Sequence, residues 1–236
     1  MKRIIGMIPN TITTLNLLSG CLACIFALKF GFEHSLHYFQ LAVIMIGCAT
    51  VFDFCDGFAA RLLHAYSALG KELDSLADMV SFGVAPGLMV YSFLSCYTDA
   101  GCMAYLALFI PAMGALRLAK FNIDDRQTTS FIGLPIPANA IFWIGAVSWA
   151  LGCLITGNSP QTAVFVIYLC IVIVPLLMVS GLRMFSLKFK NLNWRENFRR
   201  YAIIAATILF VIFCGLAGLA WTIILYIILS ALLPQR

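Results

Sequence analysis

The sequence predicts an all-α fold, a polytopic bundle of about eight transmembrane helices. Of the 236 residues, 62% are hydrophobic and only 11% are charged, and the mean hydropathy is +0.98. Soluble domains carry about a quarter charged residues, so this composition is typical of an integral membrane protein. Apolar stretches long enough to cross a bilayer as helices recur along the chain, whereas barrel strands would be shorter and would alternate.

Eight apolar runs, bounded by polar or turn-forming segments, are the expected spans. Arg117 and Lys120 close the fourth run, and Pro135 and Pro137 open the fifth, where a missing backbone donor costs little. The last two runs are short enough to form a hairpin. The runs cover residues 11–31, 36–62, 73–97, 101–120, 135–156, 162–180, 199–214 and 216–233.

The basic residues give the orientation, because Lys and Arg accumulate in short cytoplasmic loops. With eight spans and a cytoplasmic N-terminus, both termini lie inside and only Lys29 falls outside. The net charge of +5 follows from this topology and gives no indication of a nucleic-acid partner. The residues placed inside are Lys2, Arg3, Arg61, Lys71, Arg117, Lys120, Arg126, Arg183, Lys188, Lys190, Arg195, Arg199, Arg200 and Arg236.

Nine cysteines do not indicate a disulfide framework, because most lie within expected spans. Cys21 and Cys24 form an isolated CxxC pair, for which we expect no metal. The stretch LLSGC at 17–21 is similar to a lipoprotein cleavage site, but cleavage there would discard a polar segment. We therefore expect the first span to be retained and the chain to be a single membrane domain, residues 1–236.

Four of the ten acidic residues fall in one helix–loop–helix, where the second span ends and the third begins. Asp53 and Asp56 are three apart, and Asp74 and Asp78 are four apart, so each pair shares a helix face. Solvated helix ends are the simpler interpretation, but clustered carboxylates repel one another and resist desolvation. Oxygen ligands without His or Cys indicate a hard cation, and two Mg²⁺, Mn²⁺ or Ca²⁺ ions would neutralise all four acids.

Arg61 lies one helical turn beyond the acids, and a guanidinium beside metal ions binds phosphate oxygens in a bidentate manner. Gly57, Ala60 and Gly70 are small, which leaves room for a ligand or for a neighbouring helix. Metal ions and an arginine at headgroup depth predict phosphoryl transfer on a lipid. A divalent-cation transporter is the alternative from another class, although its acids are expected nearer the bilayer midplane.

The acidic segment resembles the DxxDGxxAR(x8)GxxxDxxxD pattern of the CDP-alcohol phosphatidyltransferases. The matching positions are Asp53, Asp56, Gly57, Ala60, Arg61, Gly70, Asp74 and Asp78. The resemblance implies a helical membrane enzyme, often homodimeric, that transfers a substituted phosphate from a CDP-linked lipid to an alcohol and releases CMP. Further segments are similar to the phosphatidylserine synthase branch: PNTITTLNLLSG at 9–20, SFGVAPG at 81–87, RLAKFN at 117–122 and FIGLPIPANA at 131–140.

That branch implies CDP-diacylglycerol as donor, L-serine as acceptor and Mg²⁺ or Mn²⁺ as cofactor, in a bacterial or archaeal cytoplasmic membrane. It implies a catalytic core at about 9–185, with a further hairpin at about 199–233. Glycerol 3-phosphate and inositol are alternative acceptors, and an ether lipid is an alternative donor. The resemblance implies metal binding by Asp53, Asp56, Asp74 and Asp78, with Asp78 also the general base. It implies CDP-lipid contacts at Gly57, Ala60, Arg61, Ser67 and Gly70.

Serine is zwitterionic, so its site needs a cation within reach of Asp78. Arg117, Lys120 and Asn122 are the candidates, although positive-inside bias also explains both basic residues. Lys120 stands where the branch pattern has Arg, which disfavours bidentate recognition at that position.

The first span carries polar residues spaced by three, namely Asn10, Thr13 and Asn16. They are expected to bond the nucleotide or the metal-site carboxylates, or else to cap and stabilise their own helix. The basic and aromatic segment at 181–200 is expected to lie on anionic headgroups.

Overall fold

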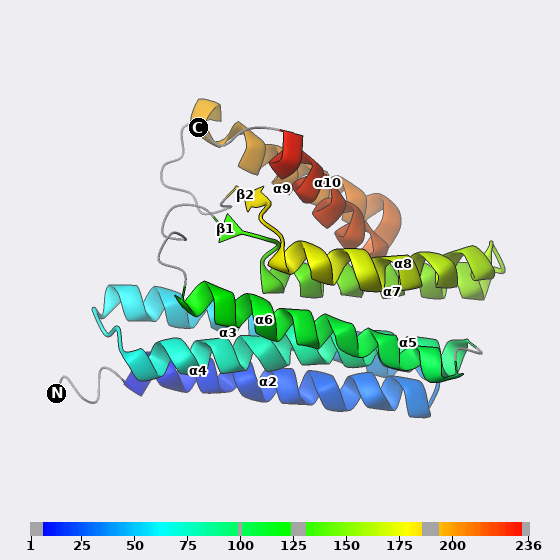
Figure 1. Ribbon diagram of the computed structural model, residues 1–236, viewed down its shortest axis with the longest axis horizontal. Helices are drawn as coiled ribbons and strands as arrows, with labels where there is room; N and C mark the ends of the chain where they lie inside the picture. The colour runs from blue at the N-terminus through cyan, green and yellow to red at the C-terminus, as the bar shows by residue number, and fades with distance from the viewer. Residues whose placement is uncertain (1–6, 99–100, 124–130, 186–193, 233–236) are drawn as a thin grey trace. The chain divides into compact units, whose positions relative to one another are not determined.

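The computed structural model describes residues 7–98, 101–123, 131–185 and 194–232 (Figure 1). Over these residues the chain is almost entirely helical, and seven stretches are long and apolar enough to cross a membrane. The predicted polytopic all-α bundle is therefore confirmed. The last of the seven stretches, residues 197–232, contains two helices that pack together, which accounts for the difference from about eight expected spans.

The chain forms two compact units, residues 1–118 and 119–236. The elements of the first unit follow one another closely along the chain, and the last helix continues beyond residue 118, where the unit ends. They are α2 (Met7–Phe32), α3 (Leu36–Leu62), α4 (Ala68–Asp78), a π-helical turn η1 (Met79–Val84), α5 (Ala85–Tyr97), a 3-10 helix η2 (Gly101–Leu108) and α6 (Phe109–Ile123).

Helix α2 is the central element of the first unit, because it packs against α3, α4, η1 and α5. Its glycines allow close approach: a Cβ at Gly20 would lie 2.3 Å from Ser81 Oγ, and one at Gly31 would lie 3.0 Å from Ser92 Cβ. Small residues let helix backbones approach in a membrane, where the hydrophobic effect between helices is weak. The close packing of α2 fixes the positions of the polar side chains that it shares with its neighbours.

The second unit is a set of helices with one short strand pair. Its elements are β1 (Phe131–Ile132), α7 (Ile136–Thr156), α8 (Pro160–Val179), β2 (Arg183–Met184), α9 (Trp194–Cys214), a 3-10 turn η4 (Gly215–Ala217) and α10 (Gly218–Leu232). The two strands pair antiparallel, with Ile132 opposite Arg183.

In the second unit, α10 packs against both α7 and α9 (Figure 1). A Cβ at Gly145 of α7 would lie 2.2 Å from the backbone nitrogen of Ala220 on α10. Pro137 lies in the first turn of α7, as its sequence position predicts, and Gly157 ends that helix in the left-handed conformation.

Several helices begin earlier than their apolar runs. Helix α2 begins at Met7 instead of residue 11, the third span at Ala68 instead of 73, and α9 at Trp194 instead of 199. The polar turns outside the apolar runs are helical too, because backbone hydrogen bonding continues where the chain leaves the hydrocarbon region. Capping by Asn10 is wrong for this reason, since Asn10 lies inside α2. Within the basic and aromatic segment, residues 186–193 lie outside the described residues.

Candidate functional site

Three carboxylates meet in the first unit. Asp53 and Asp56 lie in the last turns of α3 and Asp74 lies in α4, and one oxygen atom from each residue lies within 4.8 Å of the others. Asp56 is buried, whereas Asp53 and Asp74 are half-buried. Carboxylates this close repel one another strongly unless a cation lies between them. The donor set is oxygen only, which fits a hard divalent ion such as Mg²⁺ or Mn²⁺.

Asp78 is the last residue of α4, one helical turn beyond Asp74, and lies outside this group of three mutually close oxygens. Its Oδ1 accepts a 3.5 Å hydrogen bond from Nδ2 of Asn16 on α2. The guanidinium of Arg117 on α6 is near enough to interact electrostatically with the Asp78 carboxylate. Asp78 therefore interacts with the Asn16 amide and with the Arg117 guanidinium, and it also interacts electrostatically with the clustered acids Asp53 and Asp74.

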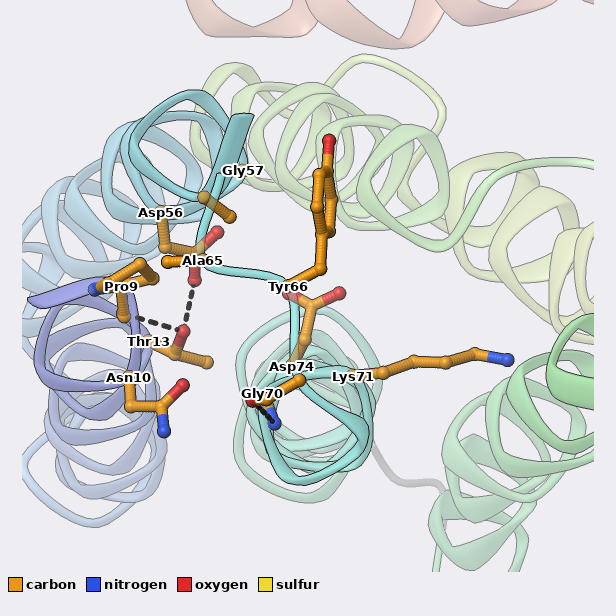
Figure 2. A pocket seen from close by; sticks show the side chains of 12 residues that line it. Pro9, Asn10, Thr13, Asp56, Gly57, Ala65, Tyr66, Gly70, Lys71 and Asp74 are labelled. Atoms are coloured by element: carbon orange, nitrogen blue, oxygen red, sulfur yellow. Dashed lines mark hydrogen bonds between the residues drawn. The ribbon is translucent and has the colours of Figure 1, made fainter. Parts of the chain in front are cut away.

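Helix α2 also contacts the acidic cluster directly. The Thr13 hydroxyl lies 2.5 Å from Oδ2 of Asp56 and 3.0 Å from the carbonyl oxygen of Pro9 (Figure 2). A hydroxyl bonded to an ionised carboxylate makes a short, strong hydrogen bond. The hydroxyl has a single proton, which lies within reach of both acceptors and is donated chiefly to the nearer one, the Asp56 carboxylate. The spacing of three along α2 is the sequence signal that identifies Thr13.

A cavity of about 220 Å³ opens beside the acids within the first unit (Figure 2). Asp56 and Asp74 line it, together with four residues for which the resemblance implies CDP-lipid contacts: Gly57, Ala60, Ser67 and Gly70. Asn10 and Thr13 of α2 also line the cavity. The remaining lining residues have no site role predicted from the sequence: Pro9, Ala65, Tyr66 and Lys71. Tyr66 and Lys71 flank Ser67 and Gly70 in the sequence, and this adjacency is the signal that identifies them.

The small lining residues have different local roles. A Cβ at Gly57 would meet nothing within 4 Å, so this position faces open space. A Cβ at Gly70 would lie 3.0 Å from both Asn10 Oδ1 and Ser67 Oγ, which leaves little room for a side chain. Ser67 is the N-cap of α4, and its hydroxyl accepts a 2.9 Å hydrogen bond from the Gly70 backbone nitrogen. Ser67 therefore has a structural role as well as a place in the cavity wall.

Arg61 lies in the last turn of α3, exposed, and does not line the cavity. Arg117 is different, because it is buried with 7% of its surface exposed. A guanidinium is rarely buried without a charged or hydrogen-bonding partner. The proximity of Arg117 to Asp78 provides such a partner and makes Arg117 a candidate for binding an anionic group beside Asp78.

Lys120 and Asn122 belong to the second unit. The Lys120 ammonium donates a 3.4 Å hydrogen bond to the carbonyl oxygen of Val179, the last residue of α8. A cation at a helix C-terminus interacts favourably with the helix dipole. Lys120 thus has a local structural contact in its own unit, while Asn122 is half-buried near the end of α6.

Comparison with known proteins gives a consistent result. The sequence model of the family "CDP-alcohol phosphatidyltransferase" matches residues 6–174. A Bacillus subtilis protein named CDP-diacylglycerol–serine O-phosphatidyltransferase is 44% identical over 132 residues, which is 55% of this chain and 69% of that protein. A Helicobacter pylori protein of the same name is 33% identical over 208 residues, covering 87% of this chain and 82% of its own.

A third protein with that name, from Mycobacterium leprae, is 36% identical over 152 residues. This match covers 61% of the present chain but only 48% of the M. leprae protein, so the chain spans about half the length of that relative. All three matches support the resemblance first seen in the acidic segment.

Proposed function

The chain belongs to the CDP-alcohol phosphatidyltransferase family, and on this premise we propose that it transfers the phosphatidyl group of CDP-diacylglycerol to L-serine. The observation that carries the proposal is the group of three carboxylates, Asp53, Asp56 and Asp74, beside a cavity lined by small residues. The names of the B. subtilis and H. pylori relatives support serine as the acceptor. The transmembrane helices make the protein a multi-pass membrane enzyme.

In the proposed reaction, the serine hydroxyl oxygen attacks the phosphorus that carries the diacylglycerol. A new bond forms between this oxygen and phosphorus, while the bond from the same phosphorus to the oxygen of CMP breaks. CMP leaves with that oxygen, and the hydroxyl proton passes to the carboxylate of Asp78 as general base. The products are phosphatidylserine and CMP, and no oxidant or reductant is required.

Four carboxylates would hold two divalent ions, Mg²⁺ or Mn²⁺, namely those of Asp53, Asp56, Asp74 and Asp78. Such ions, when bound, stabilise charge on the diphosphate and on the departing CMP. The protein's own groups then bind and orient the substrates. Gly57, Ala60 and Gly70 let the CDP moiety approach the helix backbones closely. Ser67 and Arg61 contact its polar groups, Arg61 by turning its exposed side chain toward the diphosphate.

The acceptor site in this proposal lies next to Asp78. Arg117 binds the carboxylate of serine, because it is a buried guanidinium beside the proposed base. The basic residues of the expected cytoplasmic loops support a site on the cytoplasmic face of a bacterial or archaeal membrane, and the proposed enzyme works as a homodimer among membrane phospholipids.

The test is CMP release by purified protein in detergent, with CDP-diacylglycerol and Mg²⁺ or Mn²⁺. L-Serine is compared with inositol and glycerol 3-phosphate, and Asp78→Asn is compared with Glu72→Gln, which alters an exposed acid of the same helix. We expect serine-dependent release that Asp78→Asn abolishes and Glu72→Gln preserves. Release with a different acceptor would overturn serine as substrate, and failure with every acceptor would overturn the proposed reaction.

A further inference from the structure

A chain of hydrogen bonds leads from the π-helical turn through α2 to Asp78. The Ser81 hydroxyl lies 2.8 Å from Oδ1 of Asn16, and Nδ2 of Asn16 lies 3.5 Å from Oδ1 of Asp78. Asn16 and Ser81 are both 0% exposed. Neither residue is among those that line the cavity beside the acids.

The directions of these bonds follow from the chemistry of the groups. An ionised carboxylate only accepts hydrogen bonds, so the Asn16 amide presents its NH₂ group to Asp78. The amide oxygen then points the other way and needs a donor. The Ser81 hydroxyl is this donor. Its oxygen lies 2.8 Å from the Asn16 amide oxygen and 3.1 Å from the Asn16 backbone oxygen, so its single proton is donated to the nearer amide oxygen. Ser81 thus determines which end of the amide faces Asp78.

The local backbone is built to hold this arrangement. Ser81 lies in η1, a six-residue π-helical turn that begins immediately after Asp78. π-Helical turns are rare in proteins overall, and those that do occur are often found at functional sites. Helix α2 approaches η1 so closely at Gly20 that a Cβ there would lie 2.9 Å from the Ser81 Cα. Gly20 is one helical turn from Asn16, so the same close contact holds both Asn16 and Ser81 in place.

We infer that Asn16, oriented by Ser81, is a positioning residue for Asp78. The amide fixes Oδ1 of Asp78 and leaves the second carboxylate oxygen to receive the proton of the acceptor hydroxyl. A hydrogen bond to one oxygen favours particular orientations of the carboxylate, and general-base catalysis requires the base within hydrogen-bond reach of its proton. This inference rests on the proposed function, and it goes beyond the acidic pattern, which contains neither Asn16 nor Ser81.

The inference predicts an effect on turnover more than on substrate binding. Asn16→Ala should lower kcat about 10- to 100-fold, the size of effect seen when an outer partner of a site residue is removed. Ser81→Ala should lower kcat about 3- to 10-fold, as expected for loss of a single hydrogen bond. The KM for CDP-diacylglycerol should stay within about twofold of wild type, because the residues that line the cavity are unaltered.

A double-mutant cycle tests whether Ser81 acts through Asn16. The combined variant Asn16→Ala with Ser81→Ala should be no slower than Asn16→Ala alone. Ser92→Ala is the matched control, because Ser92 is also buried and also packs against a glycine of α2, Gly31. This control should keep wild-type kcat, and additive losses in the cycle would overturn the relay from Ser81 to Asn16.

A second readout does not depend on turnover. The infrared difference spectrum between wild type and Asp78→Asn isolates the carboxylate stretch of Asp78. This band should shift in Asn16→Ala and remain in place in Ser92→Ala. Wild-type kcat in Asn16→Ala, an unshifted band, or a parallel loss of kcat and CDP-diacylglycerol binding would each overturn the inference. Absence of CMP release from the wild-type protein would instead count against the proposed reaction. The infrared band would still show whether Asn16 donates a hydrogen bond to Asp78.

Discussion

Thr13 of α2 donates a 2.5 Å hydrogen bond to Oδ2 of Asp56 on α3. Thr13 lies outside the acidic pattern, yet it is bonded to one of the three clustered carboxylates and is itself 3% exposed. The bond fixes the orientation of Asp56 in the same way that outer hydrogen bonds fix metal ligands in other proteins. The N-terminal helix therefore contributes to the geometry of a site whose acids all come from later helices.

Thr13→Val should weaken metal binding, because valine keeps the shape of threonine and removes the hydroxyl. Loss of an outer hydrogen bond typically lowers metal affinity or activity about 10- to 100-fold. The concentration of Mn²⁺ needed for half-maximal activity should rise by at least about tenfold. Thr13→Ser retains the hydroxyl and should stay near wild type. Equal behaviour of the two variants would show that the hydrogen bond has no such role.

Metal binding should also be visible without activity. A ligand that binds only the folded state stabilises that state by RT ln(1 + [L]/Kd), so the unfolding temperature rises with ligand concentration. Mn²⁺ should therefore raise the Tm of the wild-type protein in detergent, and chelation by EDTA should reverse the shift. Asp53→Asn and Asp74→Asn should remove the shift, while Glu72→Gln should keep it. A shift that survives the loss of Asp53 or Asp74 would place the ion elsewhere.

Arg117→Ala should raise the KM for serine far more than the KM for CDP-diacylglycerol. A charged hydrogen bond to a carboxylate is worth about 1.5–3 kcal/mol, which corresponds to roughly 10- to 150-fold. Arg117→Lys keeps the charge but not the bidentate geometry and should give an intermediate value. Initial rates at varied serine and fixed CDP-diacylglycerol, and the reverse, measure both constants. Equal changes in the two constants would defeat the assignment.

Lys120 offers a direct comparison with Arg117, because it bonds the end of α8. If it also binds serine, Lys120→Ala should raise the serine KM. If the helix contact is its whole contribution, the same variant should lower the Tm by a small amount and leave the serine KM unchanged. Measuring both quantities separates the two roles.

Ser67 has a capping role that a substitution series can separate from ligand contact. Ser67→Ala removes the cap of α4 and should cost about 1 kcal/mol of stability, whereas Ser67→Asn preserves a good N-cap. If Ser67 also contacts the CDP-lipid, both variants should raise the KM for CDP-diacylglycerol. Wild-type KM in the asparagine variant would leave Ser67 with the cap alone. Thermal unfolding and initial rates on the same preparations give both values.

Gly145→Ala should destabilise the protein by about 1–3 kcal/mol, because the new Cβ meets the backbone of Ala220. Gly152→Ala in the same helix meets nothing within 4 Å and should be neutral or slightly stabilising. Thermal unfolding in detergent compares the two variants. The kcat of the folded Gly145→Ala protein should remain near wild type if the C-terminal hairpin supports the fold alone. A selective loss of kcat would connect the hairpin to catalysis.

The membrane spans were predictable because hydropathy depends on composition over about twenty residues, which the sequence gives directly. The approach of Asp53 and Asp56 to Asp74 was predictable for a similar reason, since two adjacent helices with a short connection bring their facing ends together. Both inferences use local spacing alone.

Other features do not follow from the apolar pattern of the sequence. The π-helical turn at Met79–Val84 has no distinct hydropathy, so a regular helix was expected through it. The cap at Ser67 lies in a polar segment that the apolar run starting at residue 73 did not include. The contact of Lys120 with Val179 joins residues 59 positions apart. The Lys120 contact arises from tertiary packing, whereas the Ser67 cap is a local hydrogen bond from the backbone nitrogen of Gly70.

The bonds from α2 to residues much later in the chain have a consequence for how the protein is made. Asn16 is synthesised 62 residues before Asp78 and 65 before Ser81, its hydrogen-bond partners. Until those residues emerge from the ribosome, the first helix reaches the lipid with an unpaired amide, and unpaired polar groups in hydrocarbon are costly. The later helices of this unit therefore stabilise the first helix by supplying the missing partners, which favours cooperative assembly of the unit.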